Sequence, residues 1–224
     1  MATRHEEKFL IDYRQYVLLR GRAETAMRPD SNAPNGSYLI TSLYYDDRRD
    51  SALDEKLDGV RVHTKYRVRT YDANAGFIRL ERKVKRGIMT EKHSAMLRAS
   101  EIPMLSDPAT ELTYFSGRRL VLASDMRSRG LLPVVTVRYR RDAFVYPETD
   151  TRLTFDTHVE ALPPTTAHLF DASSAGTPAL PPNMVVMEVK YGEYLPTFVR
   201  KLCAACSGMQ LSVSKYALCR EAWH

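Results

Sequence analysis

Several segments of this chain alternate apolar and polar residues with a period of two, and most of the polar positions are arginine or lysine. In residues 59–71, GVRVHTKYRVRTY, Val62 and Val68 have one parity while Arg67 and Arg69 have the other. Successive side chains of a β-strand point to opposite sides of a sheet. The spacing therefore predicts a strand with one apolar face, which must be buried, and one basic face.

The same alternation occurs in the segments RHEEKFLI, GFIRLERKVKRG, TRLTFDT and VVMEVKY. The basic residues of these polar faces are Arg4, Lys8, Arg61, Lys65, Arg67, Arg69, Arg79, Lys83, Lys85, Arg152 and Lys190. The acidic residues on the same faces are Glu6, Glu81, Asp156 and Glu188. Since the whole chain carries a net charge of only +6, its positive charge is concentrated on these faces.

The pattern predicts a mainly β protein with flanking helices. Strands are predicted at residues 4–11, 37–46, 60–71, 76–86, 89–97, 133–147, 150–159 and 184–192. Helices are predicted at residues 12–28, 107–129 and 195–208. Asp12 and Asp107 are suited to cap the first two helices, and Pro196 to open the third. Residues 162–183, rich in Pro, Ala, Ser and Thr, predict a long surface loop, long enough to be mobile. We expect this loop to interrupt two strands, so that residues 1–224 form a single domain.

The composition is that of an ordinary globular protein, with 44% hydrophobic and 27% charged residues. No run approaches the ~20 apolar residues that a membrane helix needs, and the N-terminal MATRHEEKFL has no apolar signal core. We therefore expect a cytoplasmic protein, and three cysteines fit a reducing compartment. Cys203 and Cys206 form a CxxC on an apolar helix face. They are expected to be buried structural residues, since no second CxxC or histidine pair accompanies them.

Three arrangements could use such a basic sheet face: a solvated surface, a nucleic-acid interface, or the lumen of a closed barrel filled by an anion. A solvated face normally mixes charges, because like charges opposite each other destabilise paired strands. Single-strand binders interleave aromatic rings with basic residues for base stacking, and these rows contain almost none, so nucleic acid is disfavoured. Eight strands suffice to close a barrel. We therefore favour an anion-filled lumen, where arginine binds phosphate oxygens bidentately.

The few carboxylates on these faces have two possible roles. Glu6, Glu81 and Glu188 either neutralise their basic neighbours or bind a divalent metal, for which Mg²⁺ or Mn²⁺ would suit oxygen ligands. Glu188 is the first choice, because it precedes the C-terminal predicted helix and stands beside Lys190. The motifs GxxxxGKS/T, HExxH and GxSxG and the kinase signatures are absent from the sequence, which excludes those common scaffolds.

The motifs YLITSLYYDD, KYRVRTY, RLERK, RRDAFV, TRLTFDT, MEVKY and SVSKY occur in this order. Together they resemble the VTC (vacuolar transporter chaperone) domain, the polyphosphate polymerase domain of the triphosphate tunnel metalloenzyme, or CYTH-like, superfamily. The resemblance extends from about residue 4 to about residue 220. It implies an eight-stranded antiparallel β-barrel tunnel that binds a nucleoside triphosphate or polyphosphate with a divalent metal. In polymerase members the terminal phosphate of ATP passes to a growing polyphosphate chain.

The resemblance gives expected roles to individual residues, and the polar strand faces add Lys65, Glu6 and Glu81 to them. The expected catalytic residues are Arg67, Arg69, Lys83, Arg152 and Lys190. The expected substrate-binding residues are Lys8, Lys65, Lys92, Arg141, Ser214 and Lys215. The expected metal ligands are Glu188, Glu6 and Glu81. Arg138 or Arg140 could substitute for Arg141, because the strand parity of VRYRRDAF is ambiguous.

The expected function is that of a metal-dependent phosphotransferase, most specifically a polyphosphate polymerase that uses ATP. Tunnel hydrolases of the superfamily open with ExExK, whereas this chain has Arg4, Glu6 and Lys8, which favours the polymerase branch. The alternatives are a triphosphatase, in which water replaces the acceptor chain, and a non-catalytic module that binds polyphosphate or nucleotide. Translocation of a polymeric product across a membrane would require a separate membrane protein.

Overall fold

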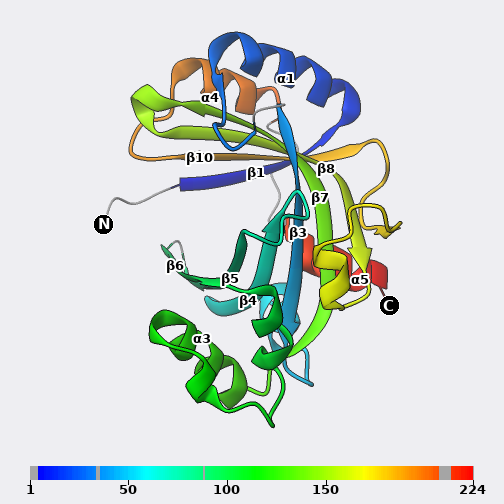
Figure 1. Ribbon diagram of the computed structural model, residues 1–224. Coiled ribbons are helices and arrows are strands. Elements are labelled where there is room, and N and C mark those ends of the chain that lie inside the picture. The colour runs from blue at the N-terminus through cyan, green and yellow to red at the C-terminus, as the bar shows by residue number, and fades with distance from the viewer. Residues whose placement is uncertain (1–4, 34–35, 88, 207–212, 224) are drawn as a thin grey trace. The chain divides into compact units, whose positions relative to one another are not determined.

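The computed structural model describes residues 5–33, 36–87, 89–206 and 213–223 (Figure 1). It divides into two compact units, each built from three stretches of the chain. Unit 1 comprises residues 1–38, 139–159 and 180–214. Unit 2 comprises residues 39–138, 160–179 and 215–224.

Among the described residues, ten strands belong to one hydrogen-bonded sheet. The strands are β1 (His5–Asp12), β2 (Arg28–Pro29), β3 (Ser37–Asp46), β4 (Val62–Tyr71), β5 (Ile78–Arg86), β6 (Met89–Leu97), β7 (Leu132–Tyr146), β8 (Thr151–Leu162), β9 (Thr177–Pro178) and β10 (Met184–Tyr191). Eight of them follow the order β1-β10-β8-β7-β3-β4-β5-β6, while β2 pairs with β7 and β9 with β8. These eight are the strands that the sequence predicts, and the mainly antiparallel β fold with flanking helices is confirmed.

The described helices are α1 (Tyr13–Ala26), α2 (Ser51–Leu57), α3 (Gly117–Ser128), α4 (Thr197–Ala204) and α5 (Lys215–Trp223). Short 3-10 turns lie at Ala99–Glu101, Pro103–Leu105, Leu112–Tyr114, Pro147–Thr149 and Thr166–Leu169. No helix of the described part of the chain is long and apolar enough to span a membrane.

In unit 1, α1 and α4 pack on one face of the strands β1, β10 and β8 (Figure 1). The odd-numbered residues of this face, among them Phe9, Phe155 and Met187, are buried in one hydrophobic cluster. The predicted helix cap is confirmed, because the Asp12 side chain accepts a hydrogen bond from the backbone of Gln15 at 2.8 Å. The apolar parity of these strands thus packs against the helices and leaves the polar parity on the opposite face.

In unit 2, the apolar faces of β3, β4 and β5 pack with α3 in a second hydrophobic cluster. Val68 and Leu80 are fully buried in it, and Met126 of α3 contributes from the helix. Even-numbered residues of β4 and β5 are therefore the core face, as the sequence predicts. Arg67, Glu81 and the other odd-numbered residues lie on the opposite face of these strands.

The predicted helix over residues 107–129 is wrong in its first half. Asp107 caps only a single turn, accepting hydrogen bonds from the backbone of Ala109 and the hydroxyl of Thr110. A 3-10 turn follows, and the helix itself begins at Gly117, whose φ of +55° is a left-handed conformation that glycine tolerates. Asp107 therefore caps a single turn, and the helix begins further along the chain.

The predicted surface loop over residues 162–183 is also corrected. It contains the 3-10 turn Thr166–Leu169 and the short strand β9, which pairs with β8. Leu169 is fully buried in the unit 2 cluster, and its carbonyl accepts a hydrogen bond from the Thr70 hydroxyl at 2.8 Å. The segment is therefore anchored to the core and is not a loop free to move along its whole length.

The cysteines are buried and reduced, as expected. Cys203 lies in α4 and Cys206 directly follows it, and both belong to the unit 1 hydrophobic cluster. Burial raises the pKa of the Cys203 thiol to about 12. A thiol in this state is inert, so the CxxC serves packing.

Candidate functional site

The predicted site residues other than Ser214 and Lys215 fall into two groups, one in each unit. The Glu188 cluster, in unit 1, consists of Glu6, Lys8, Arg141, Arg152, Thr154, Asp156, Glu188 and Lys190. The Glu81 cluster, in unit 2, consists of Ser42, Tyr44, Lys65, Arg67, Arg69, Glu81, Lys83 and Lys92. Arg4, also expected on a polar face, lies outside the described residues.

Strand register brings the Glu188 cluster together. Lys8 of β1 lies opposite Glu188 of β10, which in turn lies opposite Thr154 of β8. Lys190 lies opposite both Glu6 and Arg152. Directly opposed residues of antiparallel strands share one face of the sheet. The alternation read in the sequence therefore gathers residues of three strands that are far apart along the chain.

Two lysines and two carboxylates form an ion-pair network at the centre of this cluster. Lys8 Nζ lies 2.9 Å from Glu6 and 3.5 Å from Glu188. Lys190 Nζ lies 2.6 Å from Glu188 and 3.8 Å from Glu6. Burial favours the neutral form of Lys8, but the Glu188 and Glu6 carboxylates outweigh it and raise the lysine pKa. Lys8 therefore remains a cation although it is largely enclosed.

Of the three arginines that the sequence left open, Arg141 is the one that lies in the Glu188 cluster. Arg141 is buried and pairs bidentately with Asp156, at 2.6 and 2.8 Å. It also lines a small hollow of about 10 Å³ with Arg152, Thr154, Glu188 and Lys190. By contrast, Arg138 pairs with Glu160, and Arg140 is exposed and bonds to Ser37.

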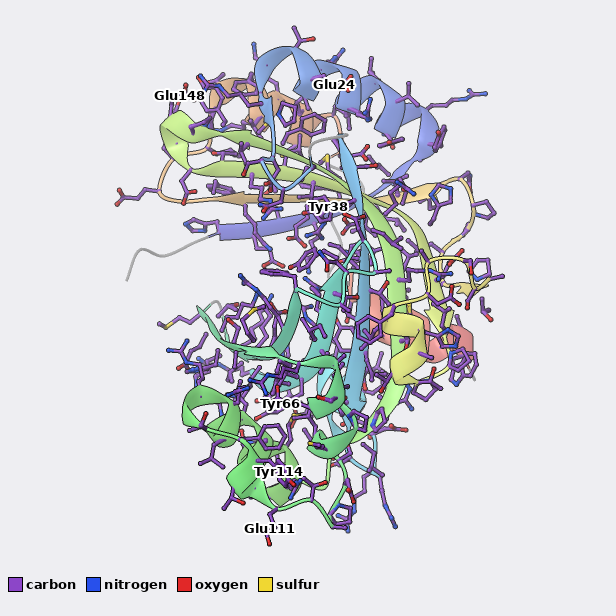
Figure 2. The ribbon with its side chains drawn as sticks, in the orientation of Figure 1. Glu24, Tyr38, Tyr66, Glu111, Tyr114 and Glu148 are labelled. Atoms are coloured by element: carbon purple, nitrogen blue, oxygen red, sulfur yellow. The ribbon has the colours of Figure 1, made fainter. Side chains whose placement is uncertain are left out.

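Arg152 is braced from outside the cluster. Its Nη2 donates to the Tyr38 hydroxyl at 2.8 Å and pairs with Asp30 at 2.7 Å. Tyr38 is labelled in Figure 2. These two partners fix one end of the guanidinium, and the sequence pattern contains no signal for either of them.

In the Glu81 cluster a buried carboxylate holds two cations. Arg67 lies opposite Glu81, and its Nε and Nη2 both reach Glu81 Oε2, at 2.7 and 2.6 Å. Lys92 contacts the other oxygen. Burial disfavours the charged form of Glu81, but Arg67, Arg69 and Lys92 outweigh it and lower its pKa to about 2. These ion pairs are those expected of a neutralising carboxylate, and the metal-ligand role of Glu81 stays a prediction.

Tyr44 belongs to this cluster and is missed by the sequence analysis. It lies opposite Arg67, whose Nη1 donates to the Tyr44 hydroxyl at 3.0 Å. Two residues earlier on β3, the Ser42 hydroxyl accepts from Arg69 Nε at 3.0 Å. The Tyr44 ring stacks on Tyr216 of α5, with centroids 5.0 Å apart. The hydroxyls of β3 thus orient two of the predicted arginines.

A row of like charges crosses the same face. Lys83 of β5 lies opposite Lys65 of β4 on one side and opposite Lys92 of β6 on the other. The Lys65 ammonium also lies over the Tyr216 ring, 5.1 Å from its centroid. Like charges opposed in this way destabilise a sheet, so an anion bound along the row would stabilise it.

The last two predicted residues lie where α5 begins. Ser214 precedes the helix, and Lys215 is its first residue. Lys215 directly precedes Tyr216, whose ring stacks on Tyr44 of the Glu81 cluster. Tyr216 also donates a hydrogen bond to Asp46 at 2.6 Å, which anchors the helix end that carries Lys215.

The donor set for a divalent metal is partial. Glu6 and Glu188 share the same two lysines and supply carboxylate oxygens on one face. The described residues contain no group of three or more His, Cys, Asp or Glu side chains that could hold a metal ion. Two carboxylates fit Mg²⁺ or Mn²⁺ when a phosphate ligand supplies further oxygens, which is how Mg²⁺ is usually bound.

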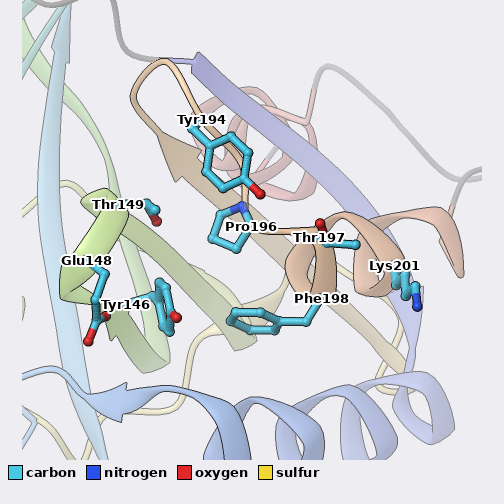
Figure 3. A pocket seen from close by; sticks show the side chains of 8 residues that line it. All are labelled: Tyr146, Glu148, Thr149, Tyr194, Pro196, Thr197, Phe198 and Lys201. Carbon is cyan, nitrogen blue, oxygen red and sulfur yellow. The ribbon is translucent and has the colours of Figure 1, made fainter.

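A larger hollow of about 500 Å³ lies elsewhere in unit 1, at the start of α4 (Figure 3). Tyr146, Pro196 and Phe198 line it, with Lys201 at its edge. It contains none of the predicted site residues. Size alone therefore does not identify the functional site, and the charged clusters remain the candidates.

Comparisons with known proteins agree with this fold. Solved structures similar to this chain include two proteins provisionally described as adenylate cyclases, from Bacillus halodurans and Vibrio parahaemolyticus, both at a TM-score of 0.51. The Bacillus protein is 10% identical, with 96% of this chain and 94% of that chain covered. The Vibrio protein is 11% identical, with 97% of each chain covered. At this identity the likeness shows the fold alone.

A search of curated proteins found no match. The family model of the VTC domain matches residues 3–224, and therefore includes every strand of both clusters. The chain belongs to the VTC domain family and is a protein of the triphosphate tunnel type.

Proposed function

We propose that this chain is a metal-dependent phosphotransferase, and specifically a polyphosphate polymerase that transfers the terminal phosphate of ATP to a polyphosphate chain. The observation that carries the proposal is the row formed by Lys65, Lys83 and Lys92, in which like charges oppose one another across three strands. A bound phosphate chain would add negative charge along this row, in which Lys92 also contacts Glu81. Membership of the VTC domain family supports the same class of ligand.

The aromatic residues favour a phosphate chain over nucleic acid. Tyr44 and Tyr216 are the rings that accompany the Glu81 cluster, and they are 7% and 1% exposed. They stack on each other and offer no open ring face to a nucleobase. Single-strand binders depend on such faces, whereas phosphate oxygens need only the cations.

In the proposed reaction, a terminal oxygen of the acceptor chain attacks the γ-phosphorus of ATP. A new P–O bond forms, the bond from the γ-phosphorus to the bridging oxygen breaks, and ADP leaves with that electron pair. Arg67 and Arg69 would bind phosphate oxygens in unit 2, and Lys190 and Arg152 would bind phosphate oxygens in unit 1. Phosphoryl transfer needs mainly this positioning and neutralisation of charge.

Glu188 and Glu6 are the residues that would hold a divalent metal, Mg²⁺ or Mn²⁺. When bound, such an ion neutralises charge on the transferring phosphoryl group. Lys8 and Lys190 contact the oxygens of Glu188, so the two lysines would lie beside a phosphate ligand of this ion.

The direct test is incubation of the purified chain with ATP and Mn²⁺ or Mg²⁺, followed by separation of phosphate chain lengths on a gel. We expect chains longer than the triphosphate of ATP. Free phosphate without longer chains would instead identify a triphosphatase. Formation of a cyclic nucleotide, or no turnover with either metal, would overturn the proposal.

The variant Glu188→Gln tests the metal assignment, because it keeps the size of the side chain and removes the charge. Turnover should fall by roughly a hundredfold or more, while binding of tripolyphosphate without metal is retained. Glu193→Gln, an exposed residue shortly after β10, is the matched control and should leave turnover unchanged. Unchanged turnover in Glu188→Gln at saturating metal would contradict the assignment.

A further inference from the structure

Thr154 stands at the centre of the Glu188 cluster, and its hydroxyl lacks a partner. It lies opposite Glu188 in the β8–β10 ladder and is 3% exposed. Its Oγ1 makes no hydrogen bond within the described part of the chain. Buried hydroxyls are almost always hydrogen-bonded, so this one requires an explanation.

A second unpartnered atom lies on the same face of the same strand. Arg152 precedes Thr154 by two residues, and its buried Nε has no hydrogen-bond partner among the residues described. The rest of this guanidinium is well held, since Nη2 contacts Tyr38 and Asp30. The missing partner of Nε therefore does not reflect a loose side chain.

Both residues line the same hollow of about 10 Å³, together with Arg141, Glu188 and Lys190. This volume suits one group of the size of a water molecule or a single oxygen atom. Arg152 Nε can only donate a hydrogen bond, and the Thr154 hydroxyl can donate as well. The missing group is thus an acceptor.

The charges around the hollow select the kind of acceptor. Arg141, Arg152 and Lys190 line the hollow, and each also pairs with a carboxylate, of Asp156, Asp30 and Glu188 respectively. One of the two unused donors, Arg152 Nε, belongs to a charged group, and a charged donor favours a negatively charged oxygen over a neutral one.

We propose that Thr154 contacts the substrate: its hydroxyl and the Nε of Arg152 donate hydrogen bonds to one oxygen of a bound phosphate group. This inference rests on the proposed function, since it assigns one oxygen of the same ligand. It adds a neutral residue to a site otherwise described by its charges. Because the contact is to the phosphate itself, it does not require the metal.

The test is calorimetric titration of the whole chain with tripolyphosphate in the absence of metal. Thr154→Val keeps the shape of the side chain and removes the hydroxyl, and it should weaken binding about tenfold or more, as expected for a lost hydrogen bond to a charged group. Thr154→Ser restores the hydroxyl and should retain most of the affinity. Thr157→Val is the matched control, because Thr157 lies on the opposite parity of β8 and bonds to the ring of His158.

Thermal unfolding of the free variants separates binding from folding. Thr154→Val should unfold at the same temperature as the wild type or higher, because it removes an unpaired buried hydroxyl. If wild type and Thr154→Val bind tripolyphosphate equally well, the inference is overturned. The hollow would then hold only water, and the proposed function would still stand. If the wild type does not bind tripolyphosphate, the proposed function fails with it.

Discussion

At the scale of single residues, Tyr44 is a buried phenol among cations. Burial favours its neutral form, but Arg67, Arg69 and Lys65 on β4 outweigh it and lower its pKa from 10.0 to about 8. The Tyr216 ring of α5 stacks on the Tyr44 ring. An anionic phenolate at this position would compete with a phosphate ligand for the same arginines.

The first prediction is a titration. The near-ultraviolet absorbance of tyrosinate should show one tyrosine with a midpoint near pH 8, and Tyr44→Phe should abolish that step. Because the pKa in the folded state is below that in the unfolded state, the phenolate stabilises the fold fully above about pH 10, and this stabilisation is lost as pH falls through about 8. The affinity of the wild type for tripolyphosphate should fall as pH rises through this midpoint, whereas the affinity of Tyr44→Phe should not. A step that persists in Tyr44→Phe would contradict the assignment.

The second prediction concerns Glu81, which is 1% exposed and holds Arg67 and Lys92. Glu81→Gln leaves these cations without their carboxylate and should lower the free energy of unfolding by about 3 kcal/mol in urea titrations. The control Glu91→Gln, at an exposed contact with His93, should change the free energy of unfolding by less than about 0.5 kcal/mol.

The pH dependence of this difference is fixed by the direction of the Glu81 pKa shift. The folded-state pKa of about 2 lies below the ordinary value of 4.5. The stabilisation is therefore fully present above about pH 4.5 and is lost as pH falls toward 2. The gap between wild type and Glu81→Gln should narrow over this range. A constant gap would show that the carboxylate charge is not what stabilises the cluster.

At the scale of elements, Asp46 at the end of β3 anchors two helices. Its carboxylate accepts hydrogen bonds from the backbone of Ala52 and Leu53 in α2, at 2.9 and 3.1 Å, and from the Tyr216 hydroxyl of α5. The side chain is 1% exposed. One buried carboxylate thus ties both helices to the strand that carries Tyr44.

The third prediction is that substitutions of Tyr216 and Asp46 reduce hydrogen-exchange protection in α2 and α5 to different extents. Tyr216→Phe removes one hydrogen bond to Asp46 and should reduce hydrogen-exchange protection in α5 by about 1–2 kcal/mol, while α2 keeps its backbone bonds. Asp46→Ala should lower protection in both helices. Tyr194→Phe, at an exposed position, is the control. Protection in α2 and α5 that is unchanged in Asp46→Ala would disprove the anchoring role.

Strand parity is the part of the fold that the sequence predicts best. In β4 and β5 apolar and basic residues separate cleanly by parity, so the faces of Val68 and Arg67 can be assigned without a structure. β3 offers no such contrast, because SYLITSLYYD has apolar or aromatic residues on both parities. The place of Tyr44 beside Arg67 is set by the β3–β4 register, which is a tertiary property.

The helices are harder to predict than the strands, because their limits also depend on tertiary contacts. Asp107 and Pro108 are residues typical of a helix N-terminus, but the helix begins only at Gly117. Between them in the chain lies Phe115, whose side chain is buried in the core. The nine-residue α5 was not predicted. Its position depends on Tyr216 reaching Asp46 and Tyr44, 170 and more residues earlier in the chain. Short helices owe their stability mainly to such packing.

At the scale of the whole molecule, three strands connect the two compact units. The divisions fall within β3 after Tyr38, within β7 after Arg138 and within β8 after Val159. Unfolding one unit would therefore disrupt strands that continue into the other. The single domain expected from the sequence stays a prediction, which the cooperativity of unfolding tests.

The fourth prediction is a single cooperative unfolding transition. The calorimetric enthalpy of unfolding should equal the van't Hoff enthalpy, as it does for a two-state domain. The loss of near-ultraviolet circular dichroism should coincide with the loss of the far-ultraviolet signal. Two separate transitions would contradict the single-domain prediction.

The central claim is that the basic faces bind a phosphate chain, and the most direct measurement is calorimetric titration of the metal-free chain with tripolyphosphate. We predict saturable binding that weakens as salt rises, and a loss of affinity of about tenfold in Lys83→Ala and in Lys190→Ala, as expected for removing one charged hydrogen-bond donor. Lys201→Ala, which removes an exposed charge outside both clusters, should bind like the wild type. Absence of binding, or equal affinity for single-stranded RNA of the same charge, would contradict the account.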